Sequence, residues 1–129
     1  MARITGIGGV FLKPGNEEGL RTFLTALGVP LEPWGTFFPW RDRDDPEKKG
    51  YTVLGLFDRD SDYFAPSDQT YMVNFRVDDL DGVLAILKEQ GHEVLKQVDE
   101  PNGRFAHVMV SGGMKVELWE PADPDPYDS

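Results

Sequence analysis

Two side chains in the last quarter of the sequence, His107 and Glu117, have the types and spacing for acid–base chemistry. They lie ten residues apart, on either side of Gly112 and Gly113. Apolar and polar residues alternate over residues 104–110 and again over 115–120, which is the period of half-buried strands. The pattern therefore predicts a β-hairpin with a carboxylate in its last strand. That carboxylate is a metal ligand, an acid or base, a ligand contact or part of a solvated face.

The register of this hairpin decides whether the two side chains can act together. Strict pairing through Gly112 and Gly113 would set Glu117 opposite Val108 and put His107 on the other face. If both side chains share a face, a histidine and a carboxylate on neighbouring strands are suited to proton transfer. The sequence pattern alone leaves both registers open.

The overall composition excludes several classes of protein. The 129 residues fit one domain, and 40% of them are apolar, which is enough for a core. Twenty-three acidic residues against 13 basic ones give a net charge of −10, which argues against nucleic-acid binding. The absence of cysteine excludes disulfides, thiolate metal sites and cysteine nucleophiles. No apolar stretch is long enough for a signal peptide or a membrane span, so we expect a cytoplasmic protein without a membrane partner.

Periodicity and turn residues divide the chain into strands and two helices. Strands are predicted over residues 4–13, 36–41, 51–57, 71–77, 93–98, 104–110 and 115–120. One helix begins after Asn16 and ends at Gly28, and a second begins after Asp78 or Asp79 and ends at Gly91. Both carry apolar residues at helical spacing: Leu20, Phe23, Leu24 and Leu27, then Leu80, Val83, Leu84 and Leu87. Pro30 and Pro33 lie in an irregular link or edge strand.

The two halves of the chain can be overlaid on each other. Leu20, Phe23 and Gly28 fall on the residues 63 positions later, which are Val83, Ile86 and Gly91. This repeat predicts an α+β domain over residues 1–121, built from two βαβββ modules at about 3–58 and 70–121. Each helix is expected to cover the outer face of its own module's sheet. Residues 122–129 form an acidic, proline-rich tail that is predicted to be disordered.

Several stretches resemble the vicinal oxygen chelate superfamily, which includes glyoxalase I, extradiol dioxygenases and the bleomycin-resistance binding proteins. They are Ile-Gly-Gly-Val-Phe at 7–11, Asn-Phe-Arg-Val-Asp-Asp-Leu-Asp at 74–81 and Val-Glu-Leu-Trp-Glu-Pro at 116–121. The spacing from Gly-Arg-Phe-Ala-His at 103–107 to Glu117 fits as well, and the resemblance covers residues 3–121. It implies a curved, mostly antiparallel, cup-shaped sheet with helices outside, a homodimer, and a hairpin in which His107 and Glu117 share the cup.

The cup of this superfamily typically holds a divalent metal, and the resemblance places the ligand positions at Gly9, Gly55, Met72 and Glu117. The internal repeat pairs the same four positions. Only Glu117 can ligate, because glycine offers no side chain and a thioether is a poor ligand for hard ions. One carboxylate is too few where three or four ligands are needed. We therefore predict no metal and no other cofactor, and a cup that is wider where glycine replaces a ligand.

The remaining residues on the cup's expected face would make an aromatic pocket with a few polar groups, as small-molecule sites have. The expected ligand-binding residues are Phe11, Phe38, Trp40, Tyr63, Met72, Asn74, Phe105 and Trp119. The alternative for the aromatic residues is an ordinary core, and for Asn74 a hydrogen bond to the wall. Residues 58–62 mimic the start of a calcium loop, but Tyr63 and Gln69 replace the required glycine and glutamate. Tyr63 and Phe64 could instead cap the mouth of the cup.

Three functions remain open from the sequence. The first is a protein of the glyoxalase and bleomycin-resistance kind that binds a small cationic or aromatic molecule in a metal-free cup. The second is a glyoxalase-type isomerase or lyase with Glu117 as base and His107 as acid. The third is an interaction or sensor module whose cup is vestigial.

Overall fold

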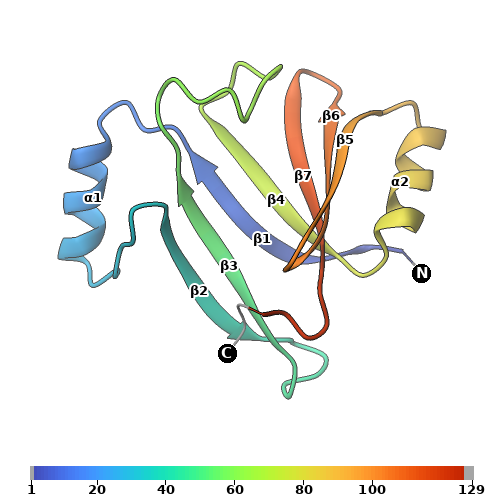
Figure 1. Ribbon diagram of the computed structural model, residues 1–129, viewed down its shortest axis with the longest axis horizontal. Coiled ribbons are helices and arrows are strands. Elements are labelled where there is room, and N and C mark those ends of the chain that lie inside the picture. The colour runs from blue at the N-terminus through green and yellow to red at the C-terminus, as the bar shows by residue number, and fades with distance from the viewer. Residues whose placement is uncertain (1, 127–129) are drawn as a thin grey trace.

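The computed structural model of the protein describes residues 2–126, which form one open, curved sheet of seven strands with two helices (Figure 1). The strands lie in the order β2-β3-β1-β4-β7-β6-β5, and α1 and α2 flank the sheet on opposite outer sides. The elements are β1 (Ile4–Leu12), α1 (Glu17–Ala26), β2 (Gly35–Arg41), β3 (Lys49–Leu56), β4 (Tyr71–Val77), α2 (Leu80–Glu89), β5 (Glu93–Glu100), β6 (Gly103–Val110) and β7 (Met114–Pro121).

The sheet is built from two similar halves that meet at its centre. β1 and β4 pair antiparallel there, and each pairs parallel on its other side, β1 with β3 and β4 with β7. The next strands outward, β2 and β6, are each antiparallel to their neighbours. The predicted α+β class is confirmed, with a sheet that mixes parallel and antiparallel pairs.

The first half has one strand fewer than the predicted repeat. β5 has no counterpart there, because the segment between α1 and β2 makes only an isolated bridge between Glu32 and Gly35. Pro30 and Pro33 lie in this segment, and proline cannot donate to a strand ladder. The first module is therefore βαββ and the second βαβββ.

Both helices begin where the capping residues predict. The Asn16 side chain accepts a hydrogen bond from the Gly19 amide at 2.9 Å, and Asp79 accepts one from the Gly82 amide at 3.1 Å. These bonds satisfy amides that have no partner within the first helical turn.

The main hydrophobic core lies between α2 and the outer face of its half of the sheet. Leu80, Val83 and Leu84 of α2 are buried against the sheet residues Val77, Ala106, Val108, Val116 and Leu118. The predicted role of the second helix as a cover for its module is confirmed.

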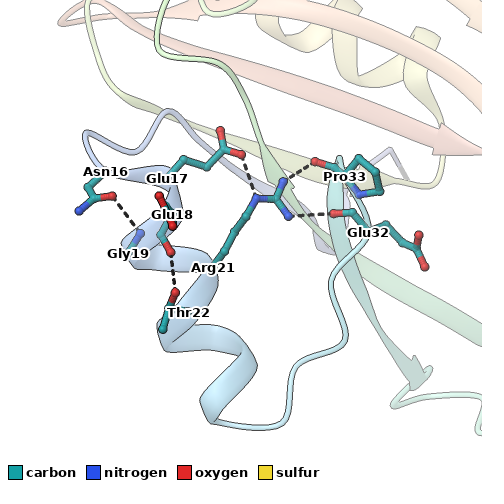
Figure 2. A network of polar contacts seen from close by, with 8 residues as sticks. All are labelled: Asn16, Glu17, Glu18, Gly19, Arg21, Thr22, Glu32 and Pro33. Carbon is teal, nitrogen blue, oxygen red and sulfur yellow. Dashed lines mark hydrogen bonds and ion pairs between the residues drawn. The ribbon is translucent and has the colours of Figure 1, made fainter.

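The same prediction is wrong for α1, which has no buried residue. Phe23 is 59% exposed and Leu27 is 68% exposed, although their spacing is that of an apolar face. Polar contacts of Arg21 hold the helix instead: its guanidinium binds Glu17 at 2.9 Å and donates to the backbone carbonyls of Glu32, at 3.1 Å, and Pro33 (Figure 2). The first module therefore leaves its helix unpacked.

The last described residues lie against the sheet. Asp125 accepts a hydrogen bond from the Tyr51 hydroxyl at 2.7 Å. Of the predicted disordered tail, residues 127–129 lie outside the described residues. Neither α1 nor α2 has the length and apolar character that a membrane-spanning helix requires.

Candidate functional site

The alternation of side chains along β4 and β7 separates the core from the cup. Val77, Val116 and Leu118 pack beneath α2. The residues between them point to the opposite, concave face. These cup-facing residues are Met72, Asn74 and Arg76 on β4 and Lys115, Glu117 and Trp119 on β7.

The β6–β7 hairpin places His107 directly opposite Glu117. The turn spans Ser111, Gly112 and Gly113, because Val110 pairs with Met114. Both glycines have positive φ, 95° and 86°, which other residues rarely adopt. This three-residue turn, and not a two-residue glycine turn, sets the register, and the expectation that His107 and Glu117 share the cup is confirmed.

Glu117 is the centre of a buried polar cluster. Asn74 Nδ2 donates to Glu117 Oε1 at 2.7 Å, and His107 Nε2 lies 2.7 Å from Oε2. The Tyr63 hydroxyl also donates to Oε2. Glu117 and His107 are 3% exposed and Asn74 is 2% exposed. Side chains from β4, β6 and the β3–β4 loop therefore converge on one carboxylate.

These hydrogen bonds keep Glu117 ionised despite its burial. Burial alone would raise the pKa of this carboxyl, but the bonds from His107, Tyr63 and Asn74 favour the charged form and bring the pKa below its ordinary value. Burial and the neighbouring Glu117 raise the pKa of Tyr63, so the phenol keeps its proton. Because an ionised carboxylate only accepts, His107 Nε2 carries the hydrogen in this contact.

One buried acceptor at this site is unsatisfied. Among the described residues, Asn74 Oδ1 is the buried side-chain atom without a hydrogen-bond partner. It faces Gly8, where an added Cβ would come within 2.1 Å of it. An unpaired buried acceptor costs about 1–3 kcal/mol. The absence of a side chain at Gly8 thus leaves space for the Asn74 amide, which its hydrogen bond to Glu117 holds in place.

The loop between β3 and β4 closes over the Glu117 cluster. Lys115, which is 6% exposed, donates from Nζ to the carbonyls of Tyr63 at 2.6 Å and Ala65 at 2.9 Å. In Figure 1 this loop reaches the end of the sheet where β6 turns into β7. The expectation that Tyr63 caps the cup agrees with this geometry, whereas Phe64 is fully buried and belongs to the core.

The side of the cup next to β1 and β3 is filled by side chains from β1, β4 and the β3–β4 loop. Phe11, Phe64 and Met72 form a buried cluster. The Phe11 ring occupies the space beside both glycines: a Cβ would come within 2.7 Å of it at Gly9 and 3.0 Å at Gly55. The expectation that these glycines widen the cup is therefore wrong, because the neighbouring phenylalanine takes up the space.

The donor set at this site does not fit a divalent metal. Gly9, Gly55 and Met72 offer no suitable ligand, and both Glu117 oxygens are occupied by hydrogen-bond donors. Within residues 2–126, no three histidine, aspartate or glutamate side chains are grouped so that they could hold a metal ion.

Trp119 and Arg76 form a second group on the same concave face. The Arg76 guanidinium lies 4.6 Å from the Trp119 ring centroid, 5.1 Å from Trp40 and 5.7 Å from Tyr51. Phe105 stacks on Trp119 with centroids 5.7 Å apart. The expected binding residues thus lie in four places. Tyr63 and Asn74 are beside Glu117, Phe11 and Met72 are in the packed cluster, and Trp40, Phe105 and Trp119 are in the group around Arg76. Phe38 is 45% exposed on β2. Arg76 and Lys115 were not among the predicted site residues, although each lies two residues from a cup-facing residue on its strand.

Two surface cavities, of about 440 and 650 Å³, lie away from Glu117. Both are lined by the beginning of β1 and by the β2–β3 turn, and Trp40 contributes to each. The smaller one also reaches Arg76 and Asp125. Neither cavity is lined by His107, Glu117 or Tyr63.

No family model matches the sequence. Solved structures that are similar to the chain include the following three. The methylmalonyl-CoA epimerase of Streptomyces coelicolor, in complex with 2-nitronate-propionyl-CoA, has a TM-score of 0.61 at 15% identity, covering 93% of this chain and 99% of its own. The methylmalonyl-CoA epimerase of Mycobacterium tuberculosis has a TM-score of 0.54 at 18% identity, covering 92% of this chain and 89% of its own. A chain of the NAD-dependent benzaldehyde dehydrogenase from Legionella pneumophila has a TM-score of 0.54 at 13% identity, covering 88% of this chain and 98% of its own.

The fold is similar to that of the two epimerases, which are members of the vicinal oxygen chelate fold and align with nearly the whole chain. At identities below 20%, the likeness extends to the fold alone. Within this fold, Glu117 lies on the concave face of the sheet with hydrogen-bond donors from Tyr63, Asn74 and His107 around it.

Proposed function

We propose that this chain is a metal-independent protein that binds a small organic molecule in the half of its cup formed by the second module. Glu117, His107 and Asn74 would hold the polar group of the ligand. The observation that carries the proposal is a buried, ionised carboxylate that receives hydrogen bonds from three separate elements. Burying such a charge costs several kcal/mol, so a purely structural position would be better served by an apolar residue.

The chemistry of the cluster favours binding over proton abstraction. A carboxylate with a lowered pKa and three donors is a weak base. It is, however, a strong acceptor for a hydroxyl or ammonium group, because hydrogen bonds to charged groups are the stronger ones. The unsatisfied Asn74 Oδ1 supplies a second acceptor nearby. A ligand with one or two donating groups therefore fits this site.

A specific observation supports an isomerase or lyase as the second candidate. His107 Nε2 and Glu117 Oε2 lie 2.7 Å apart, close enough for proton transfer between them. For Glu117 to act as a base, the Tyr63 hydroxyl would first have to leave Oε2. The packed Phe11, Phe64 and Met72 favour a vestigial cup only for the first module's side.

A ligand screen on two proteins tests the proposal. Purified wild type and Glu117→Gln are screened with small aromatic alcohols and amines by ligand-observed NMR, after treatment with a chelator. We expect binding by the wild type and at least tenfold weaker binding by Glu117→Gln, because the charged acceptor is lost. Equal binding by both proteins, or binding that returns only with added metal, would contradict the proposal.

We also propose a homodimer, formed by contact of α1 with a second copy of the chain. In the second module the corresponding helix face is buried on the sheet, whereas Phe23 of α1 and Leu27, the residue that follows the helix, are more than half exposed. Trp34, in the segment that Arg21 ties to α1, is 49% exposed as well. In a symmetric dimer, this apolar surface of one copy contacts the same surface of the other copy.

A further inference from the structure

We propose that Tyr63 occupies the ligand's own place in the cup, and that the ligand is a phenol or another aromatic molecule with a neutral hydroxyl. This inference rests on the proposed binding function of the Glu117 cluster. It adds the class of ligand and a reason why the cup is closed.

The surroundings of the Tyr63 ring are those of an aromatic binding site. The ring stacks on Phe57 with centroids 5.2 Å apart and an interplanar angle of 22°. It meets the His107 ring edge to face at 5.1 Å and 85°. The rings of Phe11 and Phe64 make T-shaped contacts with it, with centroids 6.5 and 6.4 Å away. Such arrangements stabilise an aromatic ring beyond the burial of its area.

The Tyr63 hydroxyl donates a hydrogen bond to the buried Glu117 carboxylate, so both the ring and the hydroxyl of the phenol have binding partners. The aromatic side chains contact the ring, and Glu117 Oε2 accepts from the hydroxyl. The same carboxylate repels anions: burial and the Glu117 charge together raise the pKa of the phenol beside it, so the neutral form is favoured. The site therefore selects a neutral hydroxyl donor over a carboxylate or a phenolate.

Tyr63 lies in a loop outside the sheet, so its ring can leave the cup while Phe64 beside it stays in the core. This β3–β4 loop has no helix or strand over residues 57–70, and the Tyr63 side chain is partly exposed. The cluster's other members, Asn74, His107 and Glu117, are on strands and are almost fully buried. The two bonds from Lys115 Nζ to the carbonyls of Tyr63 and Ala65 hold the loop in place.

A residue that occupies the ligand's place competes with the ligand. The tethered phenol acts at a high effective concentration, so a free phenol binds the wild-type protein only weakly. Removing the tethered ring should then strengthen binding. If Tyr63 were instead an ordinary contact of the ligand, removing it would weaken binding. The two roles thus predict opposite changes.

The experiment measures the dissociation constant of phenol for the wild type, Tyr63→Ala, and Tyr63→Ala with Glu117→Gln. Benzene, benzylamine and benzoate are measured in parallel, and circular dichroism checks the fold. We expect Tyr63→Ala to bind phenol at least tenfold more tightly than the wild type. It should prefer phenol to benzene by tenfold to a hundredfold, a preference that the double variant loses. Benzoate should bind more weakly than phenol.

Two further variants keep the inference falsifiable if Tyr63→Ala does not fold. Lys115→Met leaves Tyr63 in place but weakens the hold on the loop, so phenol should bind more tightly than to the wild type. Tyr63→Phe keeps the ring in the cup, so it should not bind phenol more tightly. Equal or weaker phenol binding by both Tyr63→Ala and Lys115→Met would overturn the inference.

The outcomes also separate this inference from the proposed function. Benzylamine binding that depends on Glu117, without a gain for phenol in Tyr63→Ala, would overturn the phenol inference and leave the binding function standing. No binding of any of the four probes to any variant would contradict both.

Discussion

Asn74 and Glu117 lie side by side in the parallel pair β4–β7, and Asn74 Nδ2 donates to Glu117 Oε1 at 2.7 Å. The corresponding pair in the first module is Phe11 and Gly55, which are also in register between β1 and β3. There, the phenylalanine ring fills the space beside the glycine. The two halves of one duplicated fold thus hold a polar cluster on one side and a packed aromatic core on the other.

The position of Asn74 depends on the missing side chain at Gly8. In Gly8→Ala the new Cβ would come within 2.1 Å of Asn74 Oδ1 and 2.9 Å of the Trp119 ring. We expect a loss of about 1–3 kcal/mol in the free energy of unfolding, measured with urea, and weaker ligand binding. Gly6→Ala on the same strand is the control, because nothing lies within 4 Å of its added Cβ. Equal costs at the two positions would refute this account of Gly8.

The stability of the protein should depend on the ionisation of Glu117. Its pKa is below the ordinary value of 4.5 in the folded chain, so the unfolded chain binds more protons between these two values. The stabilisation is present above about pH 4.5 and is lost as the pH falls through the folded pKa.

Urea unfolding between pH 3 and pH 7 checks this dependence. Other carboxylates contribute too, since the Arg104 guanidinium beside Asp81 holds the pKa of that carboxyl below its usual value. Glu117→Gln isolates the one group: its stability should be lower by about 2–4 kcal/mol at pH 7, and the difference from the wild type should shrink toward pH 3. A difference that stays constant with pH would show that the charge of Glu117 does not stabilise the fold.

Lys115 should control how readily the β3–β4 loop opens. In Lys115→Met the carbonyls of Tyr63 and Ala65 lose their charged donor. Arg59 lies exposed in this loop, so trypsin cleavage after it reports on opening. We expect cleavage at this site, followed by mass spectrometry, to be severalfold faster than in the wild type. Lys96→Met, at an exposed position on β5, should leave the cleavage rate unchanged.

The exposed face of α1 gives the proposed homodimer a direct test. Leu27 is 68% exposed in the single chain, so Leu27→Glu should leave the monomer folded. Light scattering after size exclusion should give a dimer mass for the wild type and a shift toward the monomer for the variant. A monomeric wild type would exclude the dimer, and an unaffected dimer would place the contact elsewhere.

Local sequence patterns were enough to predict most of the fold. The strand over residues 71–77 and both helix caps follow from alternation and from Asn16 and Asp79. The site residues Glu117, His107, Asn74 and Tyr63 also come together as a group. The prediction that His107 faces the cup depended on the family resemblance, because a three-residue and a two-residue glycine turn differ by one residue in register.

The failures concern contacts between distant segments. The apolar spacing of α1 predicts an amphipathic helix, but it does not determine whether a sheet packs against that face. The glycines at 9 and 55 indicate missing ligands, but only the register of β1 and β3 shows that Phe11 fills the space. Arg76 lies two residues beyond Asn74 on β4 and therefore faces the cup as well. The alternation along this strand predicts that position, but we did not include Arg76 among the predicted site residues.

We propose that the metal-free Glu117 cluster binds a small molecule. The most direct measurement is the affinity of the best screening hit for chelator-treated wild type and Glu117→Gln, by isothermal titration calorimetry. We predict stoichiometric binding to the wild type without metal and at least tenfold weaker binding to the variant. Equal affinities for the two proteins, or binding that appears only when a divalent metal is added, would contradict the account.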